Sequence, residues 1–244
     1  MANRVQQDAV NGFVNDLRAT HGDNLASVVL YGSSAVGNDI ELQPDYNLLI
    51  ALQRITPEDL RLSQAPVREW QRLGHPLPIY FTVEELRDAA DVFPIEFHNM
   101  ERARLVLHGV DPFAQLKFSD VNLRHQTEYE LRSKLIQLRR LYIPASTSIE
   151  KLCDLMMGSL TTFAGLFAPV LMLHNRKPPR AKSDCVRETI RLLKLDAEPF
   201  ERIFALRATD TQPSSVVEAN ELFTIYLAQV ERVIEAVDEM PGQV

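Results

Sequence analysis

The chain has 244 residues, of which 45% are hydrophobic and 24% are charged, and this composition is typical of a soluble globular protein with one large or two smaller domains. Its formal net charge of −7 at pH 7 argues against a general nucleic-acid-binding protein, because such a protein needs a basic surface for the phosphate backbone. A neutral or cationic small partner is favoured instead.

Two further observations bear on the cellular compartment. Cys153 and Cys185 lie in helix-like segments without metal-ligand spacing, so they are expected to be buried free thiols in a reducing cytoplasm. Residues 1–22 carry charges throughout and have no apolar core, and no signal peptide is therefore expected. These observations predict a cytoplasmic protein.

The first elements are a helix and a short strand. Apolar residues at helical spacing predict an amphipathic helix over residues 6–20 that ends before Gly22. The β-branched and aromatic run at residues 28–31 predicts a strand, which stops at Gly32 and Ser33.

A second strand is predicted to begin at Asp45. Because strand side chains alternate, Asp45, Asn47 and Leu49 should lie on one face of this strand. Gly32 lets the backbone come close to a bulky anion, and Ser33 adds a hydroxyl and an amide donor. The two segments therefore predict a phosphate-binding turn that faces an oxygen ligand suited to Mg²⁺.

These residues carry a resemblance to a known family. The segment YGSSAVGNDIELQPDYNLLIAL, residues 31–52, resembles the nucleotidyltransferase superfamily of DNA polymerase β type, and more closely the minimal domains of kanamycin-type nucleotidyltransferases. The resemblance implies that Gly32 and Ser33 bind the triphosphate of a nucleoside triphosphate. It also implies that Asp45 and Asn47 hold Mg²⁺ as the cofactor.

The segment departs from the family pattern in three ways. Asn47 stands where the family has a second carboxylate, and a neutral amide is a poorer Mg²⁺ ligand. Val36 stands where relatives often carry a basic residue. The third strand in this fold often supplies another metal carboxylate, but Ile79, Tyr80 and Phe81 supply none.

Turn and capping signals predict the rest of the first half. The expected elements are a helix over 57–74 capped by Thr56, a strand over 76–82, a short helix opened by the capping box of Thr82 and Glu85, and strands over 93–99 and 104–108. Glu96 is expected to point away from the apolar face of the strand over 93–99. Both a functional carboxylate and a solvated one remain open for it.

From Val121 onward the periodicity is helical. The apolar faces of the first and last helices are predicted to consist of Leu131, Leu135, Leu138 and Tyr142, and of Leu222, Tyr226, Val230, Val233 and Val237. Residues 155–173 carry no charge and are long enough to span a membrane. A core helix buried on all sides is preferred, because Gly158, Gly165 and Pro169 interrupt the run.

Together these segments predict an α+β fold. A nucleotidyltransferase-type mixed β-sheet flanked by helices is expected in a domain over residues 1–115, and an all-α helical bundle in a domain over residues 116–244. The order of strands and helices also resembles that of the kanamycin-type enzymes.

Nucleotidyl transfer needs a base for the acceptor hydroxyl and a cation for the phosphates. The same resemblance implies Glu130 as the base and Lys134 as a nucleotide ligand, on the first helix of the second domain. A solvated surface pair is the alternative, because Glu and Lys four positions apart are common on helices. Glu128 is the other candidate for the base.

Three hypotheses follow for function. The first is a metal-dependent enzyme that transfers a nucleoside monophosphate from a Mg-bound nucleoside triphosphate to a hydroxyl of an unidentified small-molecule or protein acceptor, with release of pyrophosphate. The second is a degenerate nucleotidyltransferase fold that binds a nucleotide or a partner without turnover, which Asn47 favours. The third is the nucleotidyltransferase half of a toxin–antitoxin-like pair. No general nucleic-acid or membrane partner is expected, and a homodimer is left open.

Overall fold

A computed structural model describes residues 2–32, 35, 46–114, 116, 119–209 and 212–240, with side chains described from residue 8 onward except at 207–209. The chain divides into two compact units, Met1–Phe118 and Ser119–Val244. Each unit has its own hydrophobic core, and each is described by itself.

The described part of the first unit contains a four-stranded mixed sheet with the order β3-β2-β1-β4. Its strands are β1 (Leu25–Tyr31), β2 (Asn47–Leu52), β3 (Ile79–Thr82) and β4 (Arg104–Gly109). β1 pairs antiparallel with β2 and β4, whereas β2 and β3 are parallel. The parallel pair needs a crossover, which two helices supply.

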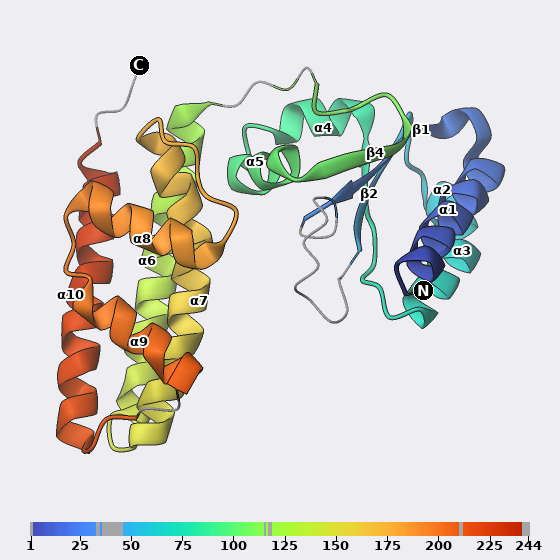
Figure 1. Ribbon diagram of the computed structural model, residues 1–244. Helices are drawn as coiled ribbons and strands as arrows, with labels where there is room; N and C mark the ends of the chain where they lie inside the picture. The colour runs from blue at the N-terminus through green and yellow to red at the C-terminus, as the bar shows by residue number, and fades with distance from the viewer. Residues whose placement is uncertain are drawn as a thin grey trace. The chain divides into compact units, whose positions relative to one another are not determined.

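Helices cover both faces of this sheet (Figure 1). One face packs on α1 (Ala2–His21) and α3 (Gln64–Arg72), with α2 (Pro57–Leu62) in contact with both helices. The other face packs on α4 (Val83–Ala89) and α5 (Pro94–Arg102). Alternation along β2 separates the two cores: Leu48 and Ile50 join Trp70 on the α1 side, and Leu49 joins Phe97 on the α5 side.

The single helix predicted over 57–74 is two helices, and Ser63 separates α2 from α3. The predicted cap is confirmed, since Thr56 and Asp59 form a reciprocal capping box with Pro57 at the first helical position. Pro66 explains the break: it has no N–H to donate to the preceding turn, and it is tolerated in the first turn of a new helix.

The strand predicted over 93–99 is wrong, because Phe93 is the N-cap residue of α5 and residues 94–99 belong to that helix. Pro94 occupies the first helical turn, and Phe97 and Met100, three positions apart on one side of the helix, join the core beneath the sheet. The first half of this segment alternates as a strand does, and that pattern led to the wrong element. Glu96 consequently lies in the first turn of a helix and not on a strand face.

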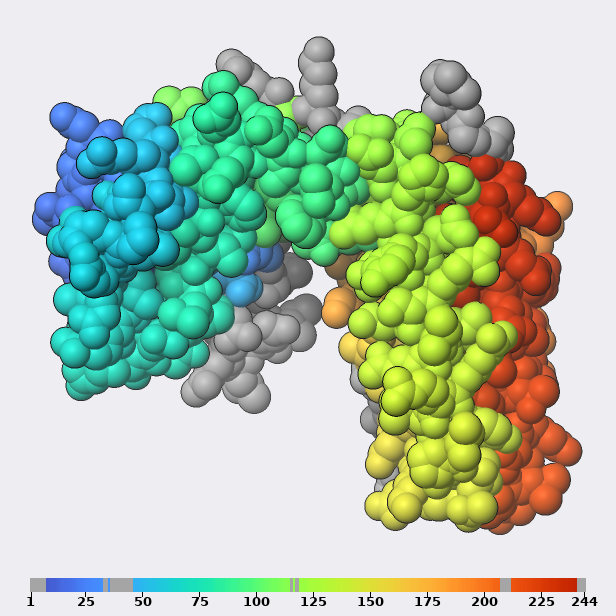
Figure 2. Space-filling model, turned by 180° about the vertical axis from the view of Figure 1, so that it is seen from behind, coloured from blue at the N-terminus to red at the C-terminus, as the bar shows by residue number. Residues whose placement is uncertain are grey.

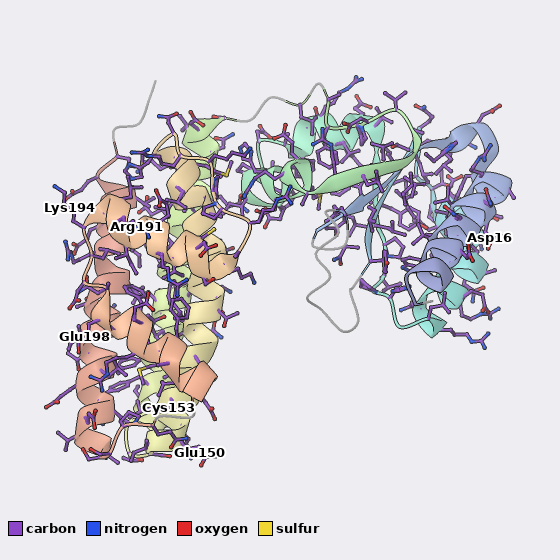
Figure 3. All side chains as sticks on the ribbon, viewed as in Figure 1. Asp16, Glu150, Cys153, Arg191, Lys194 and Glu198 are labelled. Atoms are coloured by element: carbon purple, nitrogen blue, oxygen red, sulfur yellow. The ribbon has the colours of Figure 1, made fainter. Side chains whose placement is uncertain are left out.

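The second unit is a bundle of helices (Figure 1). They are α6 (Asp120–Ala145), α7 (Ile149–Leu173), α8 (Lys182–Leu193), α9 (Glu198–Thr209) and α10 (Val216–Asp238). The predicted apolar faces of α6 and α10 are confirmed, since Leu131 and Tyr226 are both 0% exposed. The bundle interior is filled with side chains, and Glu150 and Cys153 mark the first turns of α7 in Figure 3.

Helix α7 is rich in apolar residues. It is the one helix of the described chain that meets the length and composition of a membrane span, and half of its most apolar window is buried inside the unit. Burial on all sides is therefore wrong, because Asp154, Gly158 and Thr162 form an exposed stripe. Cys153 and Cys185 are buried free thiols, as predicted.

The structure confirms the predicted α+β class, with a mixed sheet flanked by helices followed by an all-helical unit. Strand lengths and registers place the end of β1 beside the start of β2. Of the residues predicted to bind phosphate and metal, Gly32 and Asn47 lie at this edge of the sheet.

Candidate functional site

The edge of the sheet at the end of β1 brings three side chains into one row. Tyr31 is paired with Asn47 on β2 and with Arg104 on β4. Residues directly opposite each other in antiparallel strands point to the same face. Asn47 shares its face with Leu49, so the row lies on the side of the sheet that packs on α5.

Gly32 turns the chain at this edge. Its φ of +88° is in the left-handed region that favours glycine. The Gly32 N–H donates to the Ala103 carbonyl at 2.9 Å, and the Gly32 carbonyl accepts from the Ala35 N–H at 3.1 Å. A Cβ on Gly32 would lie 3.4 Å from Asn47 Nδ2. The structure thus brings Gly32 and Asn47 together, as the predicted site requires.

Asn47 has a half-buried side chain that makes no hydrogen bond to another described residue. Its amide therefore keeps its hydrogen-bonding capacity for a ligand at this edge. Ser33 and Asp45 lie outside the described residues, so their predicted roles stay predictions.

Arg104 is a member of the row that sequence reasoning did not single out. Its guanidinium forms an ion pair with Asp111 at 2.8 Å and lies 5.4 Å from the centre of the Phe113 ring. Burial raises the pKa of Asp111, but hydrogen bonds from Arg104 and the Phe113 N–H outweigh it and hold the pKa below its usual range. The sequence signal that could have pointed to Arg104 is its place at the start of a strand whose last residue, Gly109, begins a Gly-x-Asp-Pro turn.

Within the described ranges, no group of three or more His, Cys, Asp or Glu side chains could hold a metal ion. β3 contributes Ile79, Tyr80 and Phe81, which offer no carboxylate, as the sequence indicated. Of the two residues predicted to hold Mg²⁺, the described part of the chain includes Asn47, whose amide oxygen is its one candidate ligand at this edge.

The second unit carries the other predicted site residues on α6. Glu128 forms ion pairs with Arg124 at 3.7 Å and with Arg132 at 2.8 Å. Glu130 and Lys134 are half-buried, and neither side chain has a hydrogen bond or ion pair with any residue that the structure describes, including each other. The surface ion pair expected at this spacing is therefore made by Glu128, not by Glu130.

Lys134 lies in a groove between α6 and α7 that has a volume of about 380 Å³. Its lining residues are Lys134, Gln137, Leu138, Leu141, Asp154, Leu155, Gly158, Ser159, Thr162 and Phe163. Glu130 is one helical turn from Lys134 on the same side of α6. Helix α6 is the yellow-green surface of the helical unit in Figure 2, with α10 beside it in red.

Comparison with solved structures relates this fold to a characterised enzyme. The chain superimposes on a crystal structure of spectinomycin adenyltransferase AAD(9) from Enterococcus faecialis with ATP and spectinomycin, with a TM-score of 0.57. The match covers 93% of this chain and 98% of that chain at 14% sequence identity. No protein-family model and no curated protein sequence matches the chain. The chain therefore has the fold of a nucleotidyltransferase.

Proposed function

We propose that the chain is a metal-dependent nucleotidyltransferase that transfers a nucleoside monophosphate from a nucleoside triphosphate to a hydroxyl of a small molecule, with release of pyrophosphate. The observation that carries the proposal is the left-handed turn at Gly32 at the end of β1. It stands beside the Asn47 amide, which makes no side-chain hydrogen bond to another described residue. This arrangement occurs in a fold shared with an adenyltransferase whose crystal contained ATP.

The roles in the first unit follow from donor chemistry. Gly32 leaves the backbone open to a phosphate, and Ser33 supplies a hydroxyl and an N–H donor. Asp45 and Asn47 offer one carboxylate and one amide oxygen, which fit a single Mg²⁺ whose remaining ligands are phosphate oxygens and water. The metal would neutralise charge on the phosphates when bound.

The roles in the second unit follow from the ion pairs on α6. The Glu128 carboxylate already binds Arg124 and Arg132, so fewer of its oxygen lone pairs are available to an acceptor hydroxyl. Glu130 has no such partner in the described part of the chain, so it is free to accept the proton of the acceptor hydroxyl. Lys134, one turn away on α6, has no hydrogen bond or ion pair with a described residue, so its ammonium group is available to an anionic group of either substrate.

The test is pyrophosphate release from ATP and Mg²⁺ in the presence of a panel of hydroxyl-bearing small molecules that includes spectinomycin. We expect Asp45→Ala to lower turnover by more than about a hundredfold, because the metal loses its carboxylate ligand. Asp23→Ala is the control, since this exposed carboxylate lies in the turn that precedes β1. Equal activity of the Asp45 variant and the parent would overturn the site.

A second candidate function is nucleotide binding without turnover. It is favoured by Asn47, an amide where a second metal carboxylate would be expected, and by the absence of a carboxylate from β3. Calorimetric titration with ATP and Mg²⁺ distinguishes the two functions. Binding without pyrophosphate release across the panel supports the second, whereas a rise in turnover in Asn47→Asp supports a weakened enzyme.

A further inference from the structure

The groove between α6 and α7 has an apolar floor and few polar groups. Leu138 and Leu141 on α6 and Leu155 and Phe163 on α7 line it. Its volume of about 380 Å³ is within the range of small-molecule sites, roughly 300–1,000 Å³.

Gly158 lies on the α7 wall of this groove, and its lack of a side chain leaves space there. A Cβ built on Gly158 would meet no atom within 4 Å beyond its own helix, so neighbouring chain does not require a glycine here. A glycine inside a helix costs about 1 kcal/mol relative to alanine. Its effect is to leave open space between Asp154 and Thr162, which lie one turn away on either side.

Most hydroxyl donors in the groove are already used. The Ser159 hydroxyl donates to the Met156 carbonyl at 3.0 Å and contacts the Tyr226 hydroxyl at 3.1 Å. The Thr162 hydroxyl donates to the Gly158 carbonyl at 3.2 Å. A ligand therefore meets few free polar groups on the α7 wall.

The polar groups that remain are one ammonium group, one amide and one carboxylate. Lys134, Gln137 and Asp154 have no side-chain hydrogen bond or ion pair among the described residues. A polycation with many hydroxyls would find one carboxylate over an apolar floor, so it fits poorly. A triphosphate would find one ammonium group and face a carboxylate, so it also fits poorly.

We propose that this groove binds the acceptor, and that the acceptor is a small molecule with an apolar, ring-sized body. Its hydrogen-bond-accepting or acidic group faces Lys134, and a donor group faces Asp154. The proposal rests on the proposed function, because the acceptor role comes from Glu130, the candidate base one turn from Lys134 on the same side of α6.

Because the acceptor is unidentified, the probe is anilinonaphthalene sulfonate, an aromatic monoanion whose fluorescence rises in apolar sites. We expect the full-length chain to bind it saturably and Gly158→Phe to lose at least tenfold in affinity, because the ring fills the groove. Gly12→Phe is the matched control, since Gly12 is an exposed helical glycine of α1 whose Cβ would also meet nothing within 4 Å. Equal binding by both variants overturns the proposal.

Two further variants keep the test informative, one if Gly158→Phe fails to fold and one for the role of the Lys134 charge. Gly158→Ala replaces a glycine by a better helix former, so it folds even if the phenylalanine variant does not, and it should weaken the probe by a smaller factor. Lys134→Met should weaken the sulfonate probe about three- to tenfold and leave its neutral analogue phenylnaphthylamine unchanged. An equal effect on both probes overturns the charge assignment.

The last experiment tests whether the groove binds the acceptor or the nucleotide. Saturating ATP and Mg²⁺ should leave the probe bound, and displacement of the probe would assign the groove to the nucleotide and overturn the proposal. Probe binding is measured without turnover, so its failure and that of the proposed function are distinguishable. If Gly158→Phe releases pyrophosphate as fast as the parent, the groove is not the acceptor site, but the proposed enzymatic function stands. If the probe binds the groove but no panel member causes pyrophosphate release, the proposed enzymatic function is wrong, and the acceptor role of the groove is wrong with it.

Discussion

Two glycines of the first unit lie close to the ends of the sheet and have different steric surroundings. Gly32, with φ of +88°, is limited by the Asn47 side chain at 3.4 Å. Gly109, with φ of +78°, is limited by backbone, because its Cβ would lie 1.9 Å from the Ala26 carbonyl oxygen. The first neighbour can move and the second cannot, so the two positions should differ in their tolerance of a side chain.

Gly109→Ala is expected to destabilise the first unit by about 4 kcal/mol, because strained backbone and a backbone clash add together. Gly22→Ala is the control: its φ is +51°, and nothing lies within 4 Å of its Cβ, so only about 1 kcal/mol should be lost. Urea unfolding of both variants measures the difference. Similar losses would show that the close approach between β4 and β1 is not rigid.

His21 should make stability depend on pH. Burial lowers the pKa of His21, which Asp59 offsets only in part, and its Nε2 lies 2.8 Å from the Ser63 hydroxyl. The unfolded chain, with a histidine pKa of about 6.5, therefore binds more protons, and stability is lost as the pH falls below about 6.5. His21→Gln should be less sensitive to pH in this window. Parallel unfolding curves from about pH 5 to 7.5 for parent and variant would contradict this.

At the scale of single residues, the sequence predicted candidate site residues but could not predict all of their neighbours in space. Alternation along β2 placed Asn47 on one face, and the structure shows it beside Gly32. Arg104 could not be predicted as their neighbour, because its place in the row depends on the β1–β4 register, which shifts between Val28 and Val29. The positions of Ser33 and Asp45 remain predictions.

At the scale of elements, helix starts were predicted correctly where the signal lay within a few neighbouring residues. Thr56 and Thr82 each form a capping box with the carboxylate three residues later. The start at Thr82 was predicted from that spacing, and the start at Thr56 from an N-cap followed by Pro57. α5 was missed because its first residues alternate as a strand does. The groove could not be predicted, because its hollow depends on which residues of α7 face Lys134 on α6.

Lys194 offers a test of a helix end. It terminates α8 in the left-handed conformation, with φ of 52°, and the next N–H, that of Leu195, donates to the Ile190 carbonyl at 3.0 Å (Lys194 is labelled in Figure 3). Lys194→Gly is expected to raise the unfolding free energy of the helical unit by about 1 kcal/mol, because glycine adopts this conformation without strain. Lys194→Ala removes the same side chain and should give no such gain. Equal stabilities of the two variants would contradict the prediction.

At the scale of the whole molecule, the two units have separate cores, and this predicts two unfolding transitions. Leu49 and Leu152 are both 0% exposed, one in each unit. Each leucine-to-alanine change should cost its own unit about 2–5 kcal/mol. The sole tryptophan, Trp70, reports on the first unit by fluorescence, and far-ultraviolet circular dichroism reports mainly on the helical unit. A single transition moved equally by both variants would contradict independent cores.

The composition of α7 has a consequence for how the chain is made. α7 is apolar enough to resemble a membrane span, and its buried side packs against α6, α8, α9 and α10. A ribosome completes α7 well before it begins α10, so the nascent chain carries a long apolar helix whose last partner does not yet exist. The interval between these two helices is therefore when the growing polypeptide most needs a chaperone, and a stop codon placed there should give an aggregating product.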